Sequence, residues 1–557
     1  MRRLIPLGIV VLTAAVFSPT VTYDFLKSWD DAAMLLYNTH LTSWSPWWAF
    51  RSIYFGHWMP LSWLTWTIDA HAWGLWAGGW HAVNVVLHAI NAGLVYLIAR
   101  RLIGSSLGAA FAAVVWAVHP MRLESVAWVT ERKDCLSGLF FLLSIVFYLK
   151  YVDTRAGNLS EEQAEPQRLG WWRVRLPLGA SLLCFALACM AKCIVVILPV
   201  MLILLDWAAL HRRAWREKIP YVLIAAPVSV MAFYAVRVGV HNMLPWDRVG
   251  LEPRLLHVAY SWAYYAWRTV WPSRLSHMIE YTWAPSQGQT EYPIAVLIIM
   301  GVAVFLVWLR SRIVTAAVLA YALAVFPQAG LFHNGPQLVA NRYSYLASLP
   351  LVMLAGAALN LVGRPVLPGP DSISHALRIA CWEMRQWFRG AAFAGVIGFT
   401  VVTLVHLPVW RNDETLYAFA AESEPTCTLC QDWAGLLAYK RGDVAATRRY
   451  FERAIAVSDT TLVPRWERRW GLATVLTELG ETEAAIRQYR AYLASVPPSQ
   501  REYDHERAHL DNARAMIAKL ERSAAGSPPT ARGPQAFAGG RGVTWPQRVQ
   551  VRWASEP

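Results

Sequence analysis

Charged residues are scarce in this 557-residue chain: they make up 16% of it, whereas hydrophobic residues make up 56%. Soluble domains usually carry about 25% charged residues. The mean hydropathy of +0.31 also argues against one or several soluble domains of this total length. A disordered chain is excluded, because disorder requires low hydrophobicity. The composition therefore predicts a multi-pass membrane protein.

Cysteine is sparse as well, with seven residues scattered over the chain, which excludes a disulfide-stapled scaffold. Only Cys427 and Cys430 form a motif, a Cys-x-x-Cys pair at the expected start of a helix. Three states are open for this pair: a structural disulfide, reduced or metal-bound thiols, and a redox-exchange site. The disulfide is favoured, because free thiols are unusual in an oxidising compartment and no further zinc ligands lie nearby.

The sequence lacks a phosphate-binding glycine loop and a nucleophile elbow. Its 15 His residues show no metal-ligand spacing with supporting Cys or carboxylate residues, so we expect neither a metal nor a cofactor. The net charge of +14 would point to nucleic acid in a soluble protein. In a membrane protein, Lys- and Arg-rich cytoplasmic loops explain the same charge, so no nucleic-acid partner is predicted.

Apolar stretches of about 20 residues predict membrane-spanning helices. We expect an all-α fold, a polytopic helical bundle in the membrane with about eleven spans. Lys and Arg in alternate short loops mark the cytoplasmic side, and the odd number of spans places the chain after residue 410 outside. The apolar, aromatic stretch 256–272 has both ends outside and predicts an interfacial or re-entrant helix. The expected spans lie near 4–20, 82–99, 106–119, 135–149, 177–191, 193–210, 219–238, 292–309, 313–329, 343–362 and 391–409.

The pattern becomes soluble and helical from Trp410 onward. Gly442 and Gly480 are 38 residues apart, which is one tetratricopeptide period of 34 residues plus a short insertion. Small and aromatic residues around them fit two such repeats, followed by a capping helix over 499–520. The predicted domains are a membrane domain (1–410), a tetratricopeptide-repeat domain outside the membrane (411–521) and a disordered tail (522–557).

Two adjacent carboxylates, Asp30 and Asp31, stand early in the first outward loop. Neighbouring carboxylates at a membrane interface repel each other, which raises the pKa of one of them. A raised pKa suits a general base that takes a proton from a weak nucleophile. The competing interpretation, favoured on spacing alone, is that the aspartate caps a helix that begins at Ala32.

Charged groups recur in the later outward segments. The stretch 119–134 is dense in charge for a short loop, and it also fits a salt-bridged helix on the membrane surface. Lys192 lies between two apolar runs, where an ammonium group requires an anionic partner. Arg342 begins a later span, and a guanidinium can bind a phosphate through two parallel hydrogen bonds. An interfacial anchor is the equally weighted alternative for Lys192 and Arg342.

These segments resemble the TMTC-like family, multispanning proteins with tetratricopeptide repeats that are similar to protein O-mannosyltransferases. The main signature is HPMRLESVAW at 119–128, followed by ERKD at 131–134, a form that looks like bacterial members. Further motifs match in order along the chain: WDD at 29–31, HWMPLS at 57–62, NRYSYL at 341–346 and WRNDETL at 410–416.

The resemblance implies a GT-C glycosyltransferase fold in a bacterial inner membrane. It also implies transfer of a hexose, with mannose favoured, from a polyprenyl-phosphate sugar to Ser or Thr of an exported protein held by the repeats. The alternatives are a non-enzymatic membrane scaffold and a lipid or sugar transporter. We expect Asp30 to be the base of an inverting reaction, with Asp31 orienting it. The expected ligands of the donor phosphate are, in order of preference, Arg342, Lys192, and Arg132 or Lys133. The expected supporting residues are His119, Glu124 and Tyr343.

Overall fold

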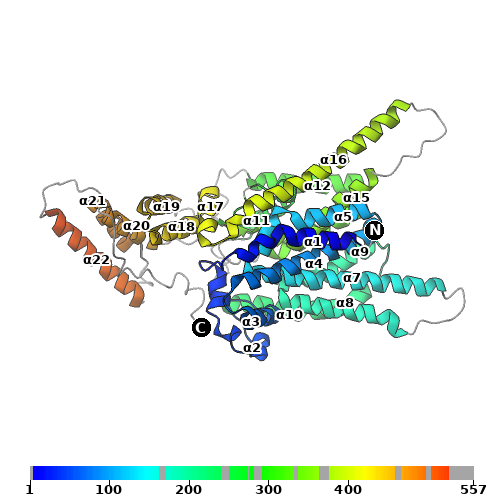
Figure 1. Ribbon diagram of the computed structural model, residues 1–557, viewed down its shortest axis with the longest axis horizontal. Helices are drawn as coiled ribbons and strands as arrows, with labels where there is room; N and C mark the ends of the chain where they lie inside the picture. Colours follow the sequence, from blue (N-terminus) through cyan, green and yellow to red (C-terminus); the bar gives the residue numbers. More distant parts are fainter. Residues whose placement is uncertain are drawn as a thin grey trace.

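The computed structural model describes residues 4–161, 171–239, 250–273, 275–280, 291–331, 337–362, 375–457, 466–496 and 504–525. These residues are almost entirely helical, so the all-α prediction is confirmed. The described strands are β1 (Ile279–Glu280) and β2 (Gln337–Val339), which pair antiparallel. A bundle of long helices forms the larger part, and shorter helices extend from one end of it (Figure 1).

Apolar helices occupy all of the predicted spans. Six of the described helices are long and apolar enough to cross a membrane, or up to eight if each of two bent pairs is one span. Three further apolar helices are shorter, so the number of eleven crossings stays a prediction. The bundle consists of α1 (Ile5–Phe17), α4 (Ala77–Ile103), α5 (Ser106–Val118), α7 (Arg132–Glu161), α8 (Trp171–Ala191), α9 (Leu198–Ala208), α10 (Ile219–Gly239), α12 (Glu291–Leu309), α13 (Arg312–Val325), α15 (Leu349–Val362) and α16 (His375–His406).

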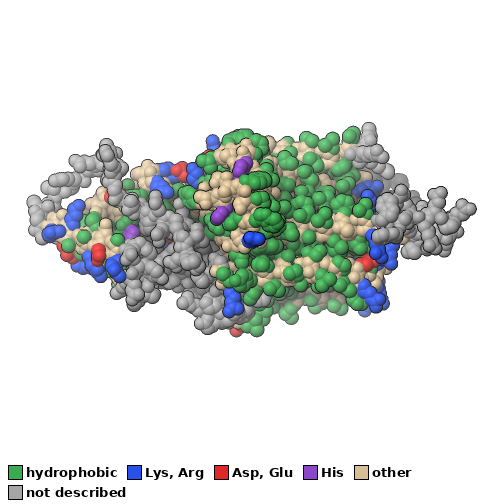
Figure 2. Space-filling view, turned by 90° about the horizontal axis from the view of Figure 1, so that it is seen from below, with side chains coloured by type: hydrophobic (Ala, Val, Ile, Leu, Met, Phe, Trp, Pro, Cys, Tyr) green, Lys and Arg blue, Asp and Glu red, His purple; other side chains and the backbone are tan. Residues whose placement is uncertain are grey.

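The outer surface of the bundle is apolar, as the composition predicts. Figure 2 shows hydrophobic side chains covering its middle, with Lys and Arg side chains gathered at the end far from the shorter helices. The stretch 256–272 lies mostly in α11 (Leu251–Val270), a single helix that packs on α12 and α13. Its position relative to the membrane surface stays a prediction.

Two spans are bent where polar residues enter the bundle. The segment Ser106–Val118 meets Pro120–Ala127 at 53°, and Asn341–Ala347 meets Leu349–Leu361 at 56°. Proline lacks a backbone N–H, which explains the end of α5 just before Pro120. The short helices beyond the bends, α6 (Leu123–Ala127), η9 (Asn341–Tyr343) and α14 (Ser344–Ala347), carry the charged motifs into the protein interior.

Helices α5 and α15 pack backbone against backbone at two glycines, Gly108 and Gly356. A Cβ added at Gly356 would overlap the carbonyl oxygen of Gly108, and the reverse holds for Gly108. Small residues at such a crossing allow backbones to pack directly, as in other membrane helix pairs.

We expect Gly356→Ala to destabilise the protein by about 1–3 kcal/mol, because the added methyl group forces the two backbones apart. Thermal unfolding in detergent measures the loss. Gly398→Ala on α16 is the matched control, since a Cβ there meets nothing within 4 Å. Equal melting temperatures for the two variants would contradict this account of the helix crossing.

The shorter helices form what we call the C-terminal helical region, residues 413–525. Helices α18 (Thr428–Lys440) and α19 (Val444–Val457) form one hairpin, and α20 (Glu467–Glu478) and α21 (Thr482–Ser495) form the next. Gly442 and Gly480 make the turns with φ of +78° and +75°, a conformation that favours glycine. This matches the arrangement expected of two tetratricopeptide repeats, whose assignment stays a prediction.

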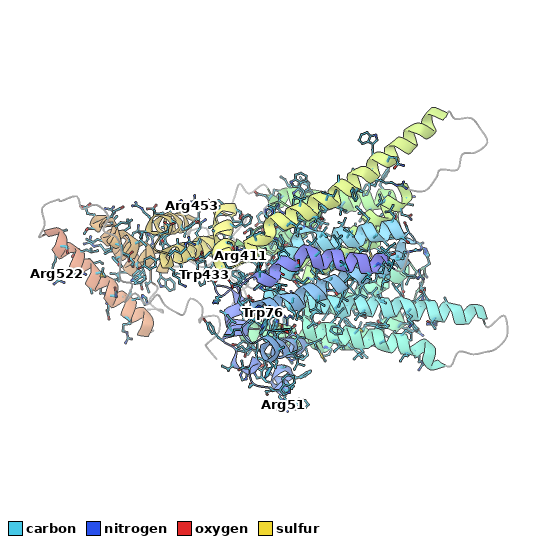
Figure 3. All side chains as sticks on the ribbon, in the orientation of Figure 1. Arg51, Trp76, Arg411, Trp433, Arg453 and Arg522 are labelled. Atoms are coloured by element: carbon cyan, nitrogen blue, oxygen red, sulfur yellow. A yellow bond between two sulfur atoms is a disulfide. The ribbon has the colours of Figure 1, made fainter. Side chains whose placement is uncertain are left out.

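The ends of the C-terminal helical region differ from the predicted limits. Its first described helix is α17 (Asp413–Ser423), and its last is α22 (Asp504–Ala525), which continues past residue 520, the expected end of the capping helix. Residues 499–503 of that prediction lie outside the described residues. Residues 522–525 belong to α22 rather than to a tail, and the remaining predicted tail, 526–557, lies outside the described residues. Figure 3 places Arg411 at the junction of this region with the bundle, and Arg522 far from it.

Candidate active site

Charges from three separate motifs meet around one buried carboxylate, Glu131. Its oxygens lie 3.1 Å from the Lys133 ammonium, 3.1 Å from the Lys192 ammonium and 3.4 Å from Nε of Arg342. The Glu131 side chain is only 1% exposed, so its charge requires such partners. Together with Glu124 and Asp134, these residues make up what we call the Glu131 cluster.

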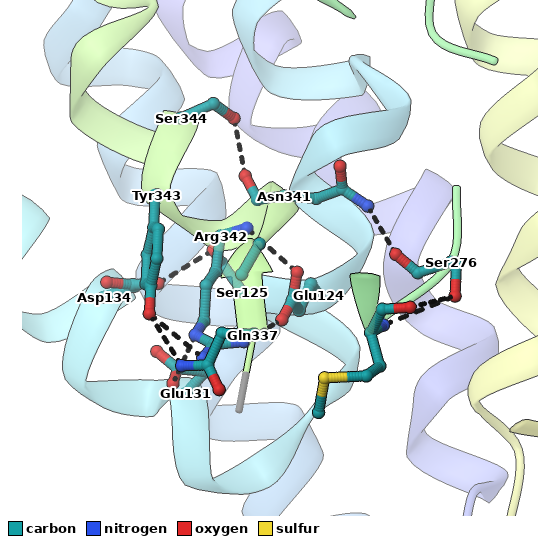
Figure 4. Close-up of polar contacts among 12 residues, drawn as sticks. Glu124, Ser125, Glu131, Asp134, Ser276, Gln337, Asn341, Arg342, Tyr343 and Ser344 are labelled. Carbon is teal, nitrogen blue, oxygen red and sulfur yellow. Dashed lines mark hydrogen bonds and ion pairs between the residues drawn. The ribbon is translucent and has the colours of Figure 1, made fainter. Parts of the chain in front are cut away.

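Arg342 is held on several sides within this cluster (Figure 4). Its Nη1 forms an ion pair with Glu124, and its backbone N–H donates to the other oxygen of that carboxylate at 3.0 Å. The ring of Tyr343 lies 4.8 Å from the guanidinium, and Gln337 donates to the Tyr343 hydroxyl. Arg342 therefore already binds two carboxylates, Glu124 and Glu131.

The two lysines of the cluster differ in how fully they are paired. The Lys192 ammonium binds both Glu131 and Asp134, the latter at 2.6 Å. The Lys133 ammonium is paired, among the described residues, with Glu131 alone, and it lies 5.8 Å from the ring centre of Trp128. An ammonium group has three donors. Lys133 is thus the cation of the cluster that is paired with the fewest carboxylates.

Asp30 lies within electrostatic range of the cluster but forms no ion pair with it. The side chain is half-buried and has no hydrogen bond or ion pair within the part of the chain that the structure describes. Burial raises the pKa of the Asp30 carboxyl, while the charges of Lys133 and Arg342 lower it. A carboxylate with a raised pKa and no fixed partner has the properties of a general base.

Asp31 has a different role. Its Oδ1 accepts hydrogen bonds from the backbone N–H (3.0 Å) and the hydroxyl (2.5 Å) of Thr130, and its Oδ2 accepts from the backbone N–H of Leu26 (2.9 Å). Burial raises the pKa of Asp31 to about 7, against the effect of these hydrogen bonds. It does not cap the following helix, η2 (Ala32–Leu36), so the capping interpretation is wrong for Asp31. Asp31 instead fixes the first loop against the turn that carries Glu131.

Two predicted site residues lie elsewhere. Arg132 forms a buried ion pair with Asp69 of α3 (Pro60–Trp73) and donates to the Asn84 side chain at 2.9 Å, so it holds the first loop rather than joining the cluster. His119 accepts from the Met121 N–H through Nδ1 and donates from Nε2 to the Thr269 carbonyl at 3.0 Å, which makes it a structural contact.

His277 is a neighbour of the site that the motifs did not single out. Its ring lies 5.1 Å from that of Trp29 and 5.2 Å from that of Tyr417. Burial, with a contribution from Arg342, lowers the pKa of His277 to about 3, so the ring is neutral. No local pattern marks this residue, because its neighbours come from distant segments. Within the described residues no group of three or more His, Cys, Asp or Glu is arranged to hold a metal, and a metal-free site stays a prediction.

The Cys427–Cys430 pair lies where the C-terminal helical region meets the bundle. The structure joins the two cysteines in a disulfide at the start of α18. Between them, Thr428 donates its N–H and hydroxyl to the carboxylate of Glu280 on β1, at 2.6 and 2.8 Å. Helix α18 is therefore attached directly to β1 of the larger part.

Parts of the chain are similar to curated proteins that carry the name protein O-mannosyl-transferase. The chain is 37% identical to Tmtc1 of Drosophila melanogaster over 100 residues, 32% identical to tmtc2 of Xenopus laevis over 152 residues, and 30% identical to human TMTC4 over 202 residues. These matches cover 18%, 25% and 32% of this chain but only 12%, 18% and 27% of the relatives. No family model and no solved structure matches. The similarities support a TMTC-like family, as the motifs predicted.

Proposed function

We propose that this TMTC-like chain is a membrane glycosyltransferase that moves a hexose, with mannose favoured, from a polyprenyl-phosphate sugar to a Ser or Thr hydroxyl of an exported protein. The observation that carries the proposal is the half-buried Asp30, unbonded and with a raised pKa, beside the cations of the Glu131 cluster. The names of the relatives support the sugar and the protein acceptor.

The proposed reaction is a single displacement with inversion. The acceptor oxygen attacks the anomeric carbon while Asp30 takes its proton, and the bond between that carbon and the phosphate oxygen breaks. The leaving phosphate gains negative charge in the transition state, so fixed cations lower the barrier. In this proposal, cations of the protein stabilise the leaving phosphate, and we propose no metal or other cofactor.

Among the cations, Lys133 is our first choice for the phosphate contact. Arg342 and Lys192 each bind two carboxylates, whereas Lys133 is paired with one. This reverses the order expected from the sequence, in which Arg342 came first. Arg342 and Lys192 then shape the cluster and contribute charge at a longer range.

Lys133→Gln should reduce turnover by about 10²-fold, the scale seen when one charge-stabilising donor is removed. Steady-state kinetics with a polyprenyl-phosphate mannose donor measures the loss. Lys150→Gln is the control, because Lys150 is an exposed lysine of the same helix. Normal turnover of the Lys133 variant would assign the phosphate contact to Arg342 or Lys192 instead.

The function itself is tested by transfer with the purified protein in lipid. Labelled polyprenyl-phosphate mannose and a Ser/Thr-rich acceptor peptide should give a mannosylated peptide with inverted anomeric configuration. Mass spectrometry of exported proteins from cells with and without this chain should show hexose-bearing peptides that are lost. The proposal fails if no hexose is transferred in vitro and no such peptide disappears.

The proposed location is the bacterial inner membrane, with the C-terminal helical region outside, on the periplasmic side. Lys and Arg side chains at the opposite end of the bundle support this orientation (Figure 2). A periplasm-dependent reporter fused after residue 525 should be active, and a cytoplasm-dependent one silent. The reverse result would contradict the proposed orientation and the position of the site at the outer face of the membrane.

The non-enzymatic alternatives explain less. A scaffold has no need to bring Asp30, Glu131 and Arg342 together from separate motifs. A transporter requires ionisable groups along a path through the bundle. Asp206 is the acidic candidate for such a path. Its carboxylate is already paired, by a buried ion pair with Lys218 and by a hydrogen bond from Tyr148 at 2.8 Å.

A further inference from the structure

The join between the bundle and the C-terminal helical region makes a close contact with the first loop. The Asp413 carboxylate accepts from the Ser28 N–H at 3.0 Å and from the Ser28 hydroxyl at 3.0 Å. The hydroxyl of Tyr417, one turn later in α17, donates to the Ser28 carbonyl oxygen at 3.1 Å. All the polar groups of Ser28 are therefore bound by α17, and we call this contact the Ser28 clamp.

The start of α17 leaves Asp413 available for this contact. Asn412 caps the helix by accepting from the Thr415 N–H at 3.0 Å, and the Thr415 hydroxyl oxygen accepts from the Asn412 N–H. The helix thus has its cap without Asp413. The segment 410–416, which the proposed chemistry does not use, places a carboxylate on Ser28.

The clamp lies directly beside the proposed base. Trp29 separates Ser28 from Asp30, and its ring packs in edge contacts with Trp128 at 5.8 Å and His277 at 5.1 Å. Asp31, on the other side of Asp30, is bonded to Thr130 and Leu26. Asp30 is therefore fixed from both sides, by the membrane part through Asp31 and by α17 through Ser28.

The phosphate side of the site is attached to the same region. Glu280, which binds the start of α18 through Thr428, lies on β1 and pairs in register with Gln337 of β2. Gln337 donates to the Tyr343 hydroxyl at 3.0 Å, and Tyr343 stacks on Arg342 (Figure 4). The C-terminal helical region thus contacts both the base side and the cation side.

We propose that α17 is a part of the transferase site, with Asp413 and Tyr417 as positioning residues that fix Asp30 against the Glu131 cluster through the Ser28 clamp. This inference rests on the proposed function. It assigns the C-terminal helical region a second role besides acceptor binding, because removal of its first helix would release the base.

The variant Asp413→Leu tests this role, since its side chain is of similar size and has no atom that can accept from the Ser28 N–H or hydroxyl. We expect kcat to fall by about 10²-fold, the scale of a small misplacement of a reacting group. The KM values for donor and acceptor should stay the same. Asp30 should also become better solvated, so its pKa falls and the acid limb of the pH–kcat profile moves to lower pH.

Two further variants complete the set. Tyr417→Phe keeps the ring and removes the hydrogen bond to Ser28. It should lower kcat and move the acid limb of the pH–kcat profile to lower pH, each by less than the Asp413 variant does. Glu414→Gln is the control, because Glu414 is the next residue of α17 and makes a half-exposed ion pair with Arg441. It should leave kcat and the pH profile unchanged.

Hydrogen exchange gives a readout that does not depend on activity. The Ser28 amide donates to Asp413, so it should exchange faster in Asp413→Leu than in the wild type or in Glu414→Gln. An active wild type whose kcat and pH profile survive Asp413→Leu overturns the positioning role alone, and so does unchanged exchange at Ser28. A wild type that transfers no hexose overturns the proposed function, even if exchange at Ser28 responds as expected.

Discussion

Asp30→Asn should reduce transfer by about 10²–10⁴-fold, the usual contribution of a general base. An amide cannot take the proton of the acceptor hydroxyl, and no other described carboxylate of the site is both unbonded and half-buried. The fold should persist, because Asp30 makes no hydrogen bond or ion pair within the described residues. Transfer kinetics and thermal unfolding, measured together, separate loss of chemistry from loss of structure.

The pH dependence provides an internal control for Asp30. A base must be ionised to act, and burial raises the pKa of this carboxyl. Activity should therefore be lost as the pH falls through that raised pKa, above the ordinary range of aspartate near 3.9. The limb should be absent from the residual activity of Asp30→Asn. Retention of most of the activity, or of the limb, would assign the base to another group.

Glu131→Gln should destabilise the protein by about 3–5 kcal/mol, the usual result of removing one partner from a buried ion pair. The carboxylate contacts three cations whose side chains are 7%, 14% and 9% exposed. A neutral amide would leave Lys133 without its ion pair, and Lys192 and Arg342 with one carboxylate each, Asp134 and Glu124. Chemical denaturation in detergent measures the difference in free energy of unfolding.

Asp153→Asn is the matched control for Glu131→Gln. Asp153 also pairs with an arginine, Arg101, but both side chains are nearly half exposed. Such surface pairs contribute about 0–1 kcal/mol, so this variant should be close to the wild type. Similar losses for the two variants would mean that the Glu131 cluster contributes no more than a surface contact.

The helices of this chain were predictable because apolar length is a local property. About 20 neighbouring apolar residues are enough to identify a candidate membrane-spanning helix. Because successive loops alternate between the two sides of the membrane, the sequence then predicted that Asp30, Lys192 and Arg342 lie on the same side. Pairing within the site was not predictable from the same information, because it depends on how bent spans pack against each other.

Arg132 and Lys133 show this limit clearly. They are adjacent in the sequence, and nothing in the sequence around them indicates which one is a phosphate ligand and which one is a structural cation. Successive residues of a helix point about 100° apart. At the start of α7 this rotation directs Arg132 to Asp69 and Lys133 to Glu131. Only the three-dimensional arrangement decides which of the two faces Asp30.

The Ser28 clamp joins residues that are 385 positions apart. During synthesis the first loop is made long before its partner, and chains grow at about 5–20 residues per second. Roughly 20–80 s therefore pass before Asp413 exists. A newly inserted bundle without α17 would hold the proposed base in no fixed position. The proposed transfer would therefore begin only after the chain has been made as far as α17 and this helix has reached the same side of the membrane as the site.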